Sequence, residues 1–236
     1  MNPDPVADPR PDVLVCAVGA ARTFGRGPTA VVAVHGASCE IAAGARLALT
    51  GPSGSGKSTL LHLLAGLDEP TAGTITWPAI GARRQLRPGP VGVVFQGPSL
   101  LPPLDVAENV ALPLLLAGRP EGQAAAAAHQ ALARLGLEEL SAKLPEELSG
   151  GQAQRVAVAR VLAGKPRLIL ADEPTGQLDH RNGAVVIDAL LEAAAALGAA
   201  LVVATHDPLV ADRFALRWTM ADGRLVIPEG SLSCSA

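Results

Sequence analysis

Short apolar runs, rich in β-branched residues and broken by glycine or polar positions, dominate the first 95 residues of this chain. Runs of this kind are typical of strands. The runs occupy residues 13–18, 30–41, 45–50, 73–77 and 91–95. Between the third and fourth runs, a glycine-rich loop precedes residues 58–67, which we predict to form a helix that Gly66 ends. A strand, a loop, a helix and a strand in this order begin an α/β unit.

From residue 97 to residue 150 the pattern changes to a helical one. Residues 106–117 favour a helix interrupted by Pro113, and residues 123–135 favour a second helix that carries an alanine run. A short acidic segment follows and ends at Leu148. We interpret the whole segment 97–150 as a helical insertion.

The α/β pattern then resumes and continues to the end of the predicted domain. Apolar strands bracketed by helices predict a parallel sheet. The predicted elements are a helix at 152–163, a strand at 168–171, a helix at 183–197, a strand at 201–205 and a hairpin about Asp222 and Gly223.

Composition narrows the class of protein. The chain has 236 residues, of which 49% are hydrophobic but only 2% aromatic, so a single domain with an aliphatic core is expected. Charged residues make up 17% and the net charge is -3, which predicts no nucleic-acid partner because no basic stripe is present to neutralise phosphates.

The ends of the chain and its most apolar stretch also shape the expected organisation. Residues 1–11 are rich in proline and aspartate and are predicted to be a disordered tail; residues 229–236 form a second tail, leaving one domain at 12–228. The stretch 189–204 contains Glu192 and Gly198 and falls short of the roughly 20 apolar residues that span a bilayer. Any contact with a membrane is therefore expected to come only through a partner.

A phosphate-binding motif follows the third predicted strand and precedes a predicted helix. The pattern G-x-x-x-x-G-K-[ST] occupies Gly51, Pro52, Ser53, Gly54, Ser55, Gly56, Lys57 and Ser58, followed by Thr59. Its glycines allow backbone N–H groups to point at phosphate oxygens, and the helix N-terminus adds partial positive charge. Lys57 can reach the β- and γ-phosphates, and the Ser58 hydroxyl can bind Mg²⁺. A plain glycine and serine turn is the alternative, which the flanking strand and helix disfavour.

Polar residues at the ends of later strands complete a hydrolytic set. Asp172 and Glu173 end an apolar strand, where ligand sites of parallel sheets lie, so Asp172 is predicted to hold Mg²⁺ and Glu173 to act as general base. His206 follows another buried strand, where it can hydrogen-bond a γ-phosphate or the attacking water, although a structural role is the alternative. The uncharged amide of Gln96 is suited to sensing Mg²⁺ or water.

The segment Leu148-Ser149-Gly150-Gly151-Gln152, together with Gln96, the acidic pair and His206 in this order, resembles the ATP-binding subunits of ABC transporters over residues 12–228. The resemblance implies the α/β fold of a P-loop NTPase, with a RecA-like, mostly parallel sheet, an N-terminal antiparallel β subdomain and the helical insertion. It also implies ATP and Mg²⁺ as cofactors.

The resemblance further implies a head-to-tail homodimer. Ser149 and Gly151 would touch the γ-phosphate of ATP bound to the second subunit, and Asp179, in a segment similar to the family's D-loop, would communicate across the interface. Phe24 would stack on adenine, with a place in the core as the alternative. The N-terminal end of a helix after Ser149 brings its dipole onto the phosphate, which gives this arrangement a physical basis.

Within the family the motifs are most similar to the macrolide-efflux, lipoprotein-release and cell-division subgroup, although the connection at 78–90 is shorter than is usual there. We therefore expect an ATPase subunit that powers a separate transmembrane permease, at the cytoplasmic face of the cell membrane, with Gln96 and the helical segment after it as the contact surface. The alternative is an ABC ATPase that regulates a membrane-bound cell-wall hydrolase without transport. Relatives that act on DNA or the ribosome carry coiled-coil insertions or paired domains, which are absent here, and the 148–152 loop disfavours a small-molecule kinase.

Overall fold

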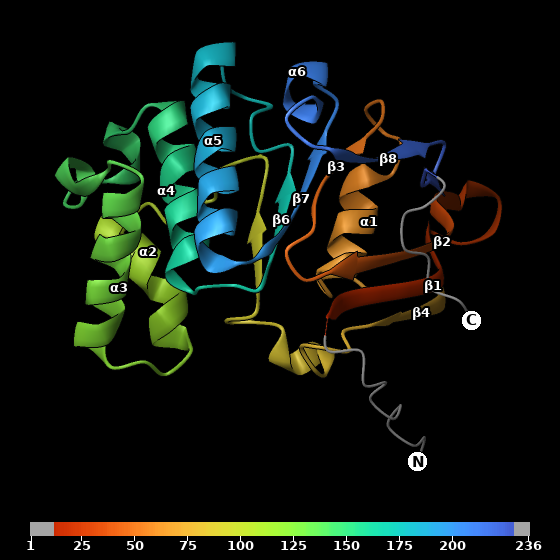
Figure 1. Cartoon of the computed structure of the whole chain (residues 1–236), viewed down its shortest axis with the longest axis horizontal. Coiled ribbons are helices and arrows are strands. Elements are labelled where there is room, and N and C mark those ends of the chain that lie inside the picture. Colours follow the sequence, from red (N-terminus) through yellow and green to blue (C-terminus); the bar gives the residue numbers. More distant parts are fainter. Residues whose placement is uncertain (1–11, 229–236) are drawn as a thin grey trace.

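A computed structural model of the chain describes residues 12–228, whose strands form two sheets (Figure 1). The larger sheet has the strand order β5-β6-β7-β3-β8-β9, and its strands are parallel except for β9, which pairs antiparallel with β8. Its strands are β3 (Arg46–Thr50), β5 (Val91–Val94), β6 (Leu168–Asp172), β7 (Ala200–Thr205), β8 (Leu216–Ala221) and β9 (Arg224–Val226). The tails predicted at 1–11 and 229–236 lie outside the described residues.

The smaller sheet is antiparallel and has the order β2-β1-β4. Its strands are β1 (Val13–Phe24), β2 (Val31–Ala42) and β4 (Ala72–Thr76). The expected mostly parallel core and N-terminal antiparallel β subdomain are therefore both present.

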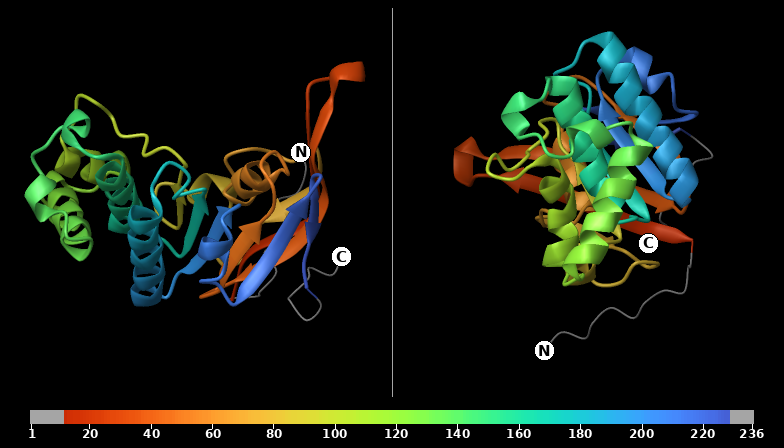
Figure 2. Two further views of the ribbon diagram at one scale, coloured as in Figure 1. Left: turned by 90° about the horizontal axis from the view of Figure 1, so that it is seen from above. Right: turned by 90° about the vertical axis from the view of Figure 1, so that its left-hand side faces the viewer.

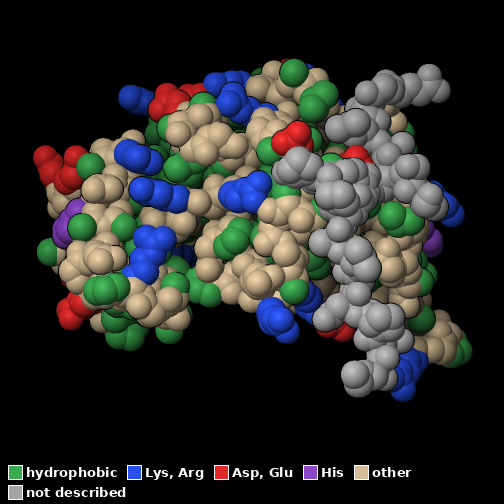
Figure 3. All heavy atoms as spheres, turned by 60° about the horizontal axis from the view of Figure 1, so that its bottom comes forward, with side chains coloured by type: hydrophobic (Ala, Val, Ile, Leu, Met, Phe, Trp, Pro, Cys, Tyr) green, Lys and Arg blue, Asp and Glu red, His purple; other side chains and the backbone are tan. Residues whose placement is uncertain are grey.

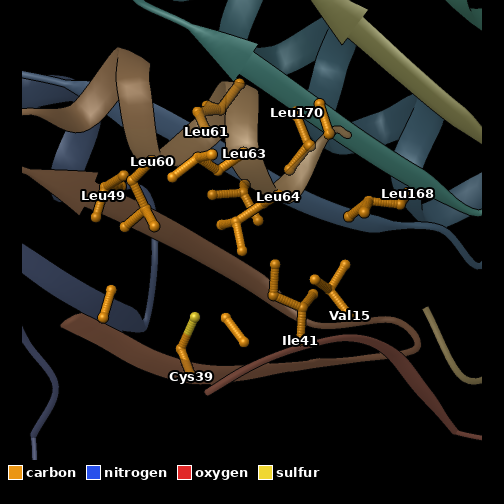
Figure 4. Close-up of a cluster of buried hydrophobic side chains, with 14 of the residues drawn as sticks. Val15, Cys39, Ile41, Leu49, Leu60, Leu61, Leu63, Leu64, Leu168 and Leu170 are labelled. Carbon is orange, nitrogen blue, oxygen red and sulfur yellow. The ribbon is translucent and has the colours of Figure 1, made fainter. Parts of the chain in front are cut away.

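Helix α1 (Lys57–Leu64) lies between the two sheets, which explains why it carries leucines on more than one face. Its leucines are fully buried, and Figure 4 shows them between Val15 and Ile41 of the antiparallel sheet and Leu168 and Leu170 of β6. The alternate β6 residues, Ile169 and Ala171, pack in a second cluster on the opposite face of the parallel sheet. Because successive side chains of a strand face opposite ways, a sheet covered on both faces needs an unbroken apolar run.

The second cluster is covered by helices α4 (Gly150–Ala163), α5 (His180–Leu197) and the short helix α6 (Pro208–Ala211). The structure starts α4 two residues, and α5 three residues, earlier than the hydrophobic pattern predicts. The cause is local, because the side chains of Ser149 and Asp179 cap these helices by accepting hydrogen bonds from Gln152 N and Asn182 N.

The predicted helical insertion contains α2 (Val106–Leu116) and α3 (Glu121–Arg134), which pack with α4 in a third cluster of their own. The expected interruption at Pro113 was wrong, because α2 continues through it; Val110 and Leu114 bury its face against this cluster. The acidic segment forms two short 3₁₀ turns, Glu138–Leu140 and Pro145–Glu147. Figure 2 shows α2 and α3 at the opposite end of the molecule from the β1–β2 hairpin, whose tip projects from the body.

The surface of the described residues carries dispersed charge. On the face shown in Figure 3, small groups of lysine and arginine side chains are separated by neutral and hydrophobic ones. Among residues 12–228, no helix combines the length and the apolar character needed to cross a membrane.

Candidate functional site

The phosphate loop connects β3 to α1, and two of its glycines leave no room for a side chain. A Cβ at Gly51 (φ +144°) would overlap the carbonyl oxygen of Met220, and a Cβ at Gly56 (φ +97°) would overlap that of Ala33. Both backbone angles also favour glycine. Gly56, the N-cap of α1, has no side chain with which to cap the helix, so the first N–H groups of α1 remain available to an anion.

The rest of the loop presents both exposed and buried polar groups. Pro52, Ser53 and Gly54 are exposed, whereas Ser55 is buried and accepts a hydrogen bond from Gly223 N at its carbonyl (3.0 Å). The hydroxyl of Ser55 has no hydrogen-bond partner within the described part of the chain. A buried hydroxyl without a partner beside open N–H groups fits a loop that closes around phosphate oxygens.

Lys57 places one buried cation inside the loop, with its side chain only 4% exposed. Its Nζ atom donates to the carbonyls of Gly51 (2.9 Å) and Pro52 (3.0 Å) and lies 3.3 Å from Oε1 of Glu173. The sheet therefore brings together a lysine and a carboxylate that lie far apart in the sequence.

Ser58 and Asp172 form the adjoining polar pair. The Ser58 hydroxyl donates to Oδ1 of Asp172 at 2.9 Å, across the neighbouring ends of α1 and β6. Burial raises the pKa of Asp172, and the Ser58 hydrogen bond opposes that rise. A hydroxyl and a carboxylate are oxygen donors of the kind Mg²⁺ takes together with substrate phosphates, and no cluster of three or more His, Cys, Asp or Glu side chains within residues 12–228 offers a metal cage instead.

Glu173 follows β6 and turns back toward the loop with a left-handed backbone (φ +45°), which is unusual for a residue with a side chain. Its backbone N–H donates to Ala204 O (2.9 Å), and its Oε2 atom lies 2.5 Å from Nδ1 of His206. A cavity of about 360 Å³ opens beside this pair and also borders Asp179. The carboxylate thus contacts a lysine on one side and a histidine on the other.

Gln96 lies two residues after the end of β5, and its amide approaches the loop after β6, where a Cβ at Gly176 would lie 3.2 Å from Nε2 of Gln96. Two residues of α4 that sequence reasoning missed hold the segment around it. Gln154 Nε2 donates to Phe95 O (3.0 Å), and the Arg160 guanidinium donates to the carbonyls of residues 98 and 99. Polar residues within the otherwise apolar helix α4 were the available signal.

The N-cap and first turn of α4, which we call the Ser149–Gln152 loop, form hydrogen bonds within the segment, and Ser149 and Gly150 are exposed. Ser149 N donates to Oε1 of Gln152 (2.8 Å), and Ser149 Oγ accepts from Gln152 N (3.3 Å). A Cβ at Gly150 would make an ordinary contact with Leu178 at 3.8 Å, while a Cβ at Gly151 would come within 3.2 Å of the Asn182 side chain. The printed partners of Ser149 and of Lys57 are different residues, and in Figure 1 α4 and α1 lie on either side of α5 and β6.

Asp179 and Phe24 lie at the margins of this arrangement. The Asp179 carboxylate accepts hydrogen bonds from Asn182 N and Asn182 Nδ2, both at 2.8 Å, and the first of these lowers the pKa of Asp179 most. Phe24 ends β1 with 44% of its side chain exposed, so the alternative of a core position was wrong. The Arg22 guanidinium lies 4.8 Å from the centre of the Phe24 ring.

Five predicted site side chains therefore lie together in the described residues: Lys57, Glu173 and His206 are joined by ion pairs, and the hydrogen-bonded side chains of Ser58 and Asp172 adjoin them. Gln96 borders the same region. The Ser149–Gln152 loop and Phe24 lie outside the cluster.

A family model and several known proteins match this chain. The family model described as ABC transporter matches residues 34–176. The lipoprotein-releasing system ATP-binding protein LolD of Legionella pneumophila (strain Paris) is 42% identical over 228 residues, covering 94% of this chain and 97% of that protein. LolD of Shewanella oneidensis is 40% identical over 227 residues, covering 93% and 99%.

Solved structures are similar over most of the chain. The dimeric post-hydrolysis structure of the ATP-binding cassette MJ0796, bound to ADP and Pi, has a TM-score of 0.81 and 33% identity, covering 92% of this chain and 100% of that one. The structure of cbiO1 from Clostridium perfringens, part of the ABC transporter complex cbiONQ, has a TM-score of 0.77 and 29% identity, covering 92% and 88%.

Proposed function

This chain belongs to the ABC transporter family as an ATP-binding, ATP-hydrolysing subunit, and from that premise we propose which residues carry the reaction and which system it serves. The observation that supports the proposal best is the cluster in which Glu173 contacts both Lys57 and His206. A buried cation, a carboxylate and a histidine meet at the open N-terminal end of α1. We propose that residues 12–228 form a single ATPase domain around this cluster.

The proposed chemistry assigns one task to each side chain. Lys57 leaves its loop carbonyls to neutralise the β- and γ-phosphates, and the N–H groups of the loop bind the remaining oxygens. Glu173 accepts the proton of the attacking water, while His206 orients the carboxylate and hydrogen-bonds the γ-phosphate or that water. Fixed donors placed where charge develops are the largest single contribution in reactions of this type.

Ser58 and Asp172 would hold Mg²⁺, with Gln96 sensing the ion or the water beside it. The bound ion would neutralise phosphate charge during transfer. The Ser58–Asp172 hydrogen bond keeps both oxygen donors at the same corner of the site before any ion binds. Burial that raises the Asp172 pKa agrees with a carboxylate that gains from a cation nearby.

A second copy of the chain would complete the site. The start of α4, with Ser149, Gly151 and Gln152, is proposed to meet the γ-phosphate held by the opposite subunit in a head-to-tail homodimer, and Asp179 would lie at the same interface. Support comes from the dimeric state of the similar cassette, which holds ADP and Pi. ATP binding would favour closure, and hydrolysis would remove that preference.

The proposed system is a lipoprotein-releasing transporter. Two relatives at 40% and 42% identity over nearly their whole length carry that name, which favours transport over the alternative of regulating a cell-wall hydrolase. The chain would contact the membrane only through a permease subunit, at the cytoplasmic face of the cell membrane. The proposed permease surface consists of Gln96 and the helical insertion that begins at the next residue. Helix α4 packs with α2 and α3 of this insertion, and its Gln154 donates to the backbone just before Gln96.

Replacing Glu173 by glutamine tests the catalytic assignment. Glu173→Gln keeps the size and one hydrogen-bonding oxygen but removes the base, so the rate of phosphate release should fall roughly 10²–10⁴-fold. Asp188→Asn is the matched control, because Asp188 of α5 forms an exposed ion pair with Arg213, and this variant should stay within about twofold of the unmodified chain. A Glu173→Gln variant that hydrolyses ATP within about tenfold of the unmodified chain would refute the assignment.

A further inference from the structure

Phe24 is a half-exposed aromatic residue near the tip of a hairpin. It ends β1 at the β1–β2 hairpin, whose tip projects from the body of the molecule (Figure 2). The ring is 44% exposed, and its paired residue across the hairpin, Val31, is 63% exposed. Because nearly half of this residue is open to solvent, a neighbour that lies against one face of the ring influences which face remains free.

Arg22 is the neighbour that contacts the ring. It lies two residues before Phe24 on the same strand, and its guanidinium carbon is 4.8 Å from the ring centre. This distance is well within the roughly 6 Å at which a cation attracts an aromatic face. The guanidinium therefore covers one face of the ring.

Asp68 fixes the guanidinium in turn. The Nε atom of Arg22 lies 2.8 Å from Oδ2 of Asp68, and their side chains are 24% and 29% exposed. Asp68 belongs to the segment that follows α1, and this segment is joined to β1 by further bonds: Thr71 N donates to Ala21 O (2.8 Å), and Thr23 N donates to Thr71 Oγ1 (3.2 Å). The chain of contacts runs from the end of the phosphate-loop helix to the aromatic ring.

We propose that Arg22, held by Asp68, is a positioning residue for the nucleotide base: it backs one face of Phe24 so that the other face is presented for stacking. This inference rests on the proposed adenine contact of Phe24 and extends it to two residues outside the nucleotide motifs. Arg22 does not touch the nucleotide in this arrangement. Its effect should depend on the base and should be independent of the phosphates.

Calorimetric binding of ADP and of inorganic pyrophosphate separates these effects, because neither ligand is hydrolysed and only ADP carries a base. Phe24→Ala should raise the dissociation constant for ADP about tenfold, as loss of a base stack does. Arg22→Met keeps most of the side-chain length without the charge, and it should raise the same constant about three- to fivefold. Pyrophosphate affinity should stay within about twofold of the unmodified chain in both variants, which also reports that the phosphate loop is folded.

Arg26→Met is the matched control, since it removes the same charge from an exposed position on the same hairpin and should leave ADP affinity essentially unchanged. Arg22→Lys should restore most of the affinity, because a cation is retained over the ring. In the Phe24→Ala background, Arg22→Met should have no further effect on ADP binding, since the ring on which it acts is gone.

Three results would overturn the inference. Arg22→Met could weaken pyrophosphate as much as ADP, which would make Arg22 a phosphate attractor. Arg22→Met could leave ADP affinity as unchanged as Arg26→Met does. It could also weaken ADP binding as much in the Phe24→Ala background as in the unmodified chain. The proposed stacking role of Phe24 fails separately, if Phe24→Ala itself binds ADP as tightly as the unmodified chain.

Discussion

The phosphate-loop cluster and the Ser149–Gln152 loop differ in how completely one copy of the chain assembles them. Lys57, Ser58, Asp172 and Glu173 already contact one another or His206, whereas the Ser149 side chain accepts a hydrogen bond from Gln152 N of its own loop. The first region stands at adjacent strand ends of one parallel sheet, and the second begins a helix whose other face belongs to the separate helical cluster. A single chain therefore assembles the phosphate-loop half of the proposed site and leaves the Ser149–Gln152 half exposed at its surface.

The largest effect is expected where the site is already assembled. Lys57→Ala removes the buried cation of the phosphate loop, so ATP hydrolysis should fall roughly 10²–10³-fold, and ADP affinity should fall with it. Steady-state phosphate release and calorimetry measure the two effects. Lys143→Ala, which removes a lysine from the helical insertion, is the control and should leave the hydrolysis rate and the ADP affinity essentially unchanged. A Lys57→Ala variant with the rate and affinity of Lys143→Ala would contradict the assembled site around Lys57.

Comparing two helix caps separates the effect of Ser149 on stability from its effect on ATP hydrolysis. Ser149 and Asp105 each form a capping box, at the starts of α4 and α2. Ser149→Ala and Asp105→Ala should each lower the free energy of unfolding by about 1 kcal/mol in urea titrations. Only Ser149→Ala should also slow ATP hydrolysis, by roughly tenfold, since it alone loses a hydrogen bond to a charged phosphate. Equal rates of ATP hydrolysis in the two variants would show that Ser149 only caps α4 and does not contact the phosphate.

The smallest expected effects are changes in the free energy of unfolding with pH, which have opposite signs for Asp172 and Asp179. Burial raises the pKa of Asp172, so this carboxyl keeps its proton to a higher pH in the folded chain than in the unfolded chain. The stability that this difference contributes is present at low pH and is lost as pH rises through the raised pKa. In metal-free buffer, Asp172→Asn should thus gain stability relative to the unmodified chain as pH rises from about 3 to about 7.

Asp179 should behave in the other direction. Its hydrogen bonds from Asn182 lower its pKa, so the stability it contributes is present above the ordinary aspartate pKa and is lost as pH falls through the lowered one. Asp179→Ala should therefore be less stable than the unmodified chain near neutral pH, with a deficit that shrinks in acid. Urea midpoints across the pH range measure both slopes, and two parallel slopes would contradict the assigned environments.

The two regions also differ in what the sequence predicts about them. The phosphate loop and the acidic pair at the end of β6 were predictable because each is a local motif with flanks that fix its place in a parallel sheet. The hydrogen bonds of Gln154 and Arg160 to the segment after β5, and the contact of Arg22 with Asp68, were not, since each joins residues far apart in sequence. Pro113 shows the converse: local propensity predicts a break in α2, and packing of the helical cluster overrides it.

Complementation between two inactive variants tests most directly whether the site is shared between copies. Lys57→Ala and Ser149→Arg are purified separately, mixed and assayed for ATP hydrolysis. In a head-to-tail mixed dimer both changes fall in one site, and the other site keeps an unmodified Lys57 and an unmodified Ser149. If the site is shared between copies, mixing raises the rate well above that of either variant alone, up to about half the unmodified rate per mixed dimer, as expected if each site works independently. A mixture no more active than its two components, while the unmodified chain is active in the same assay, would contradict a site built from two copies.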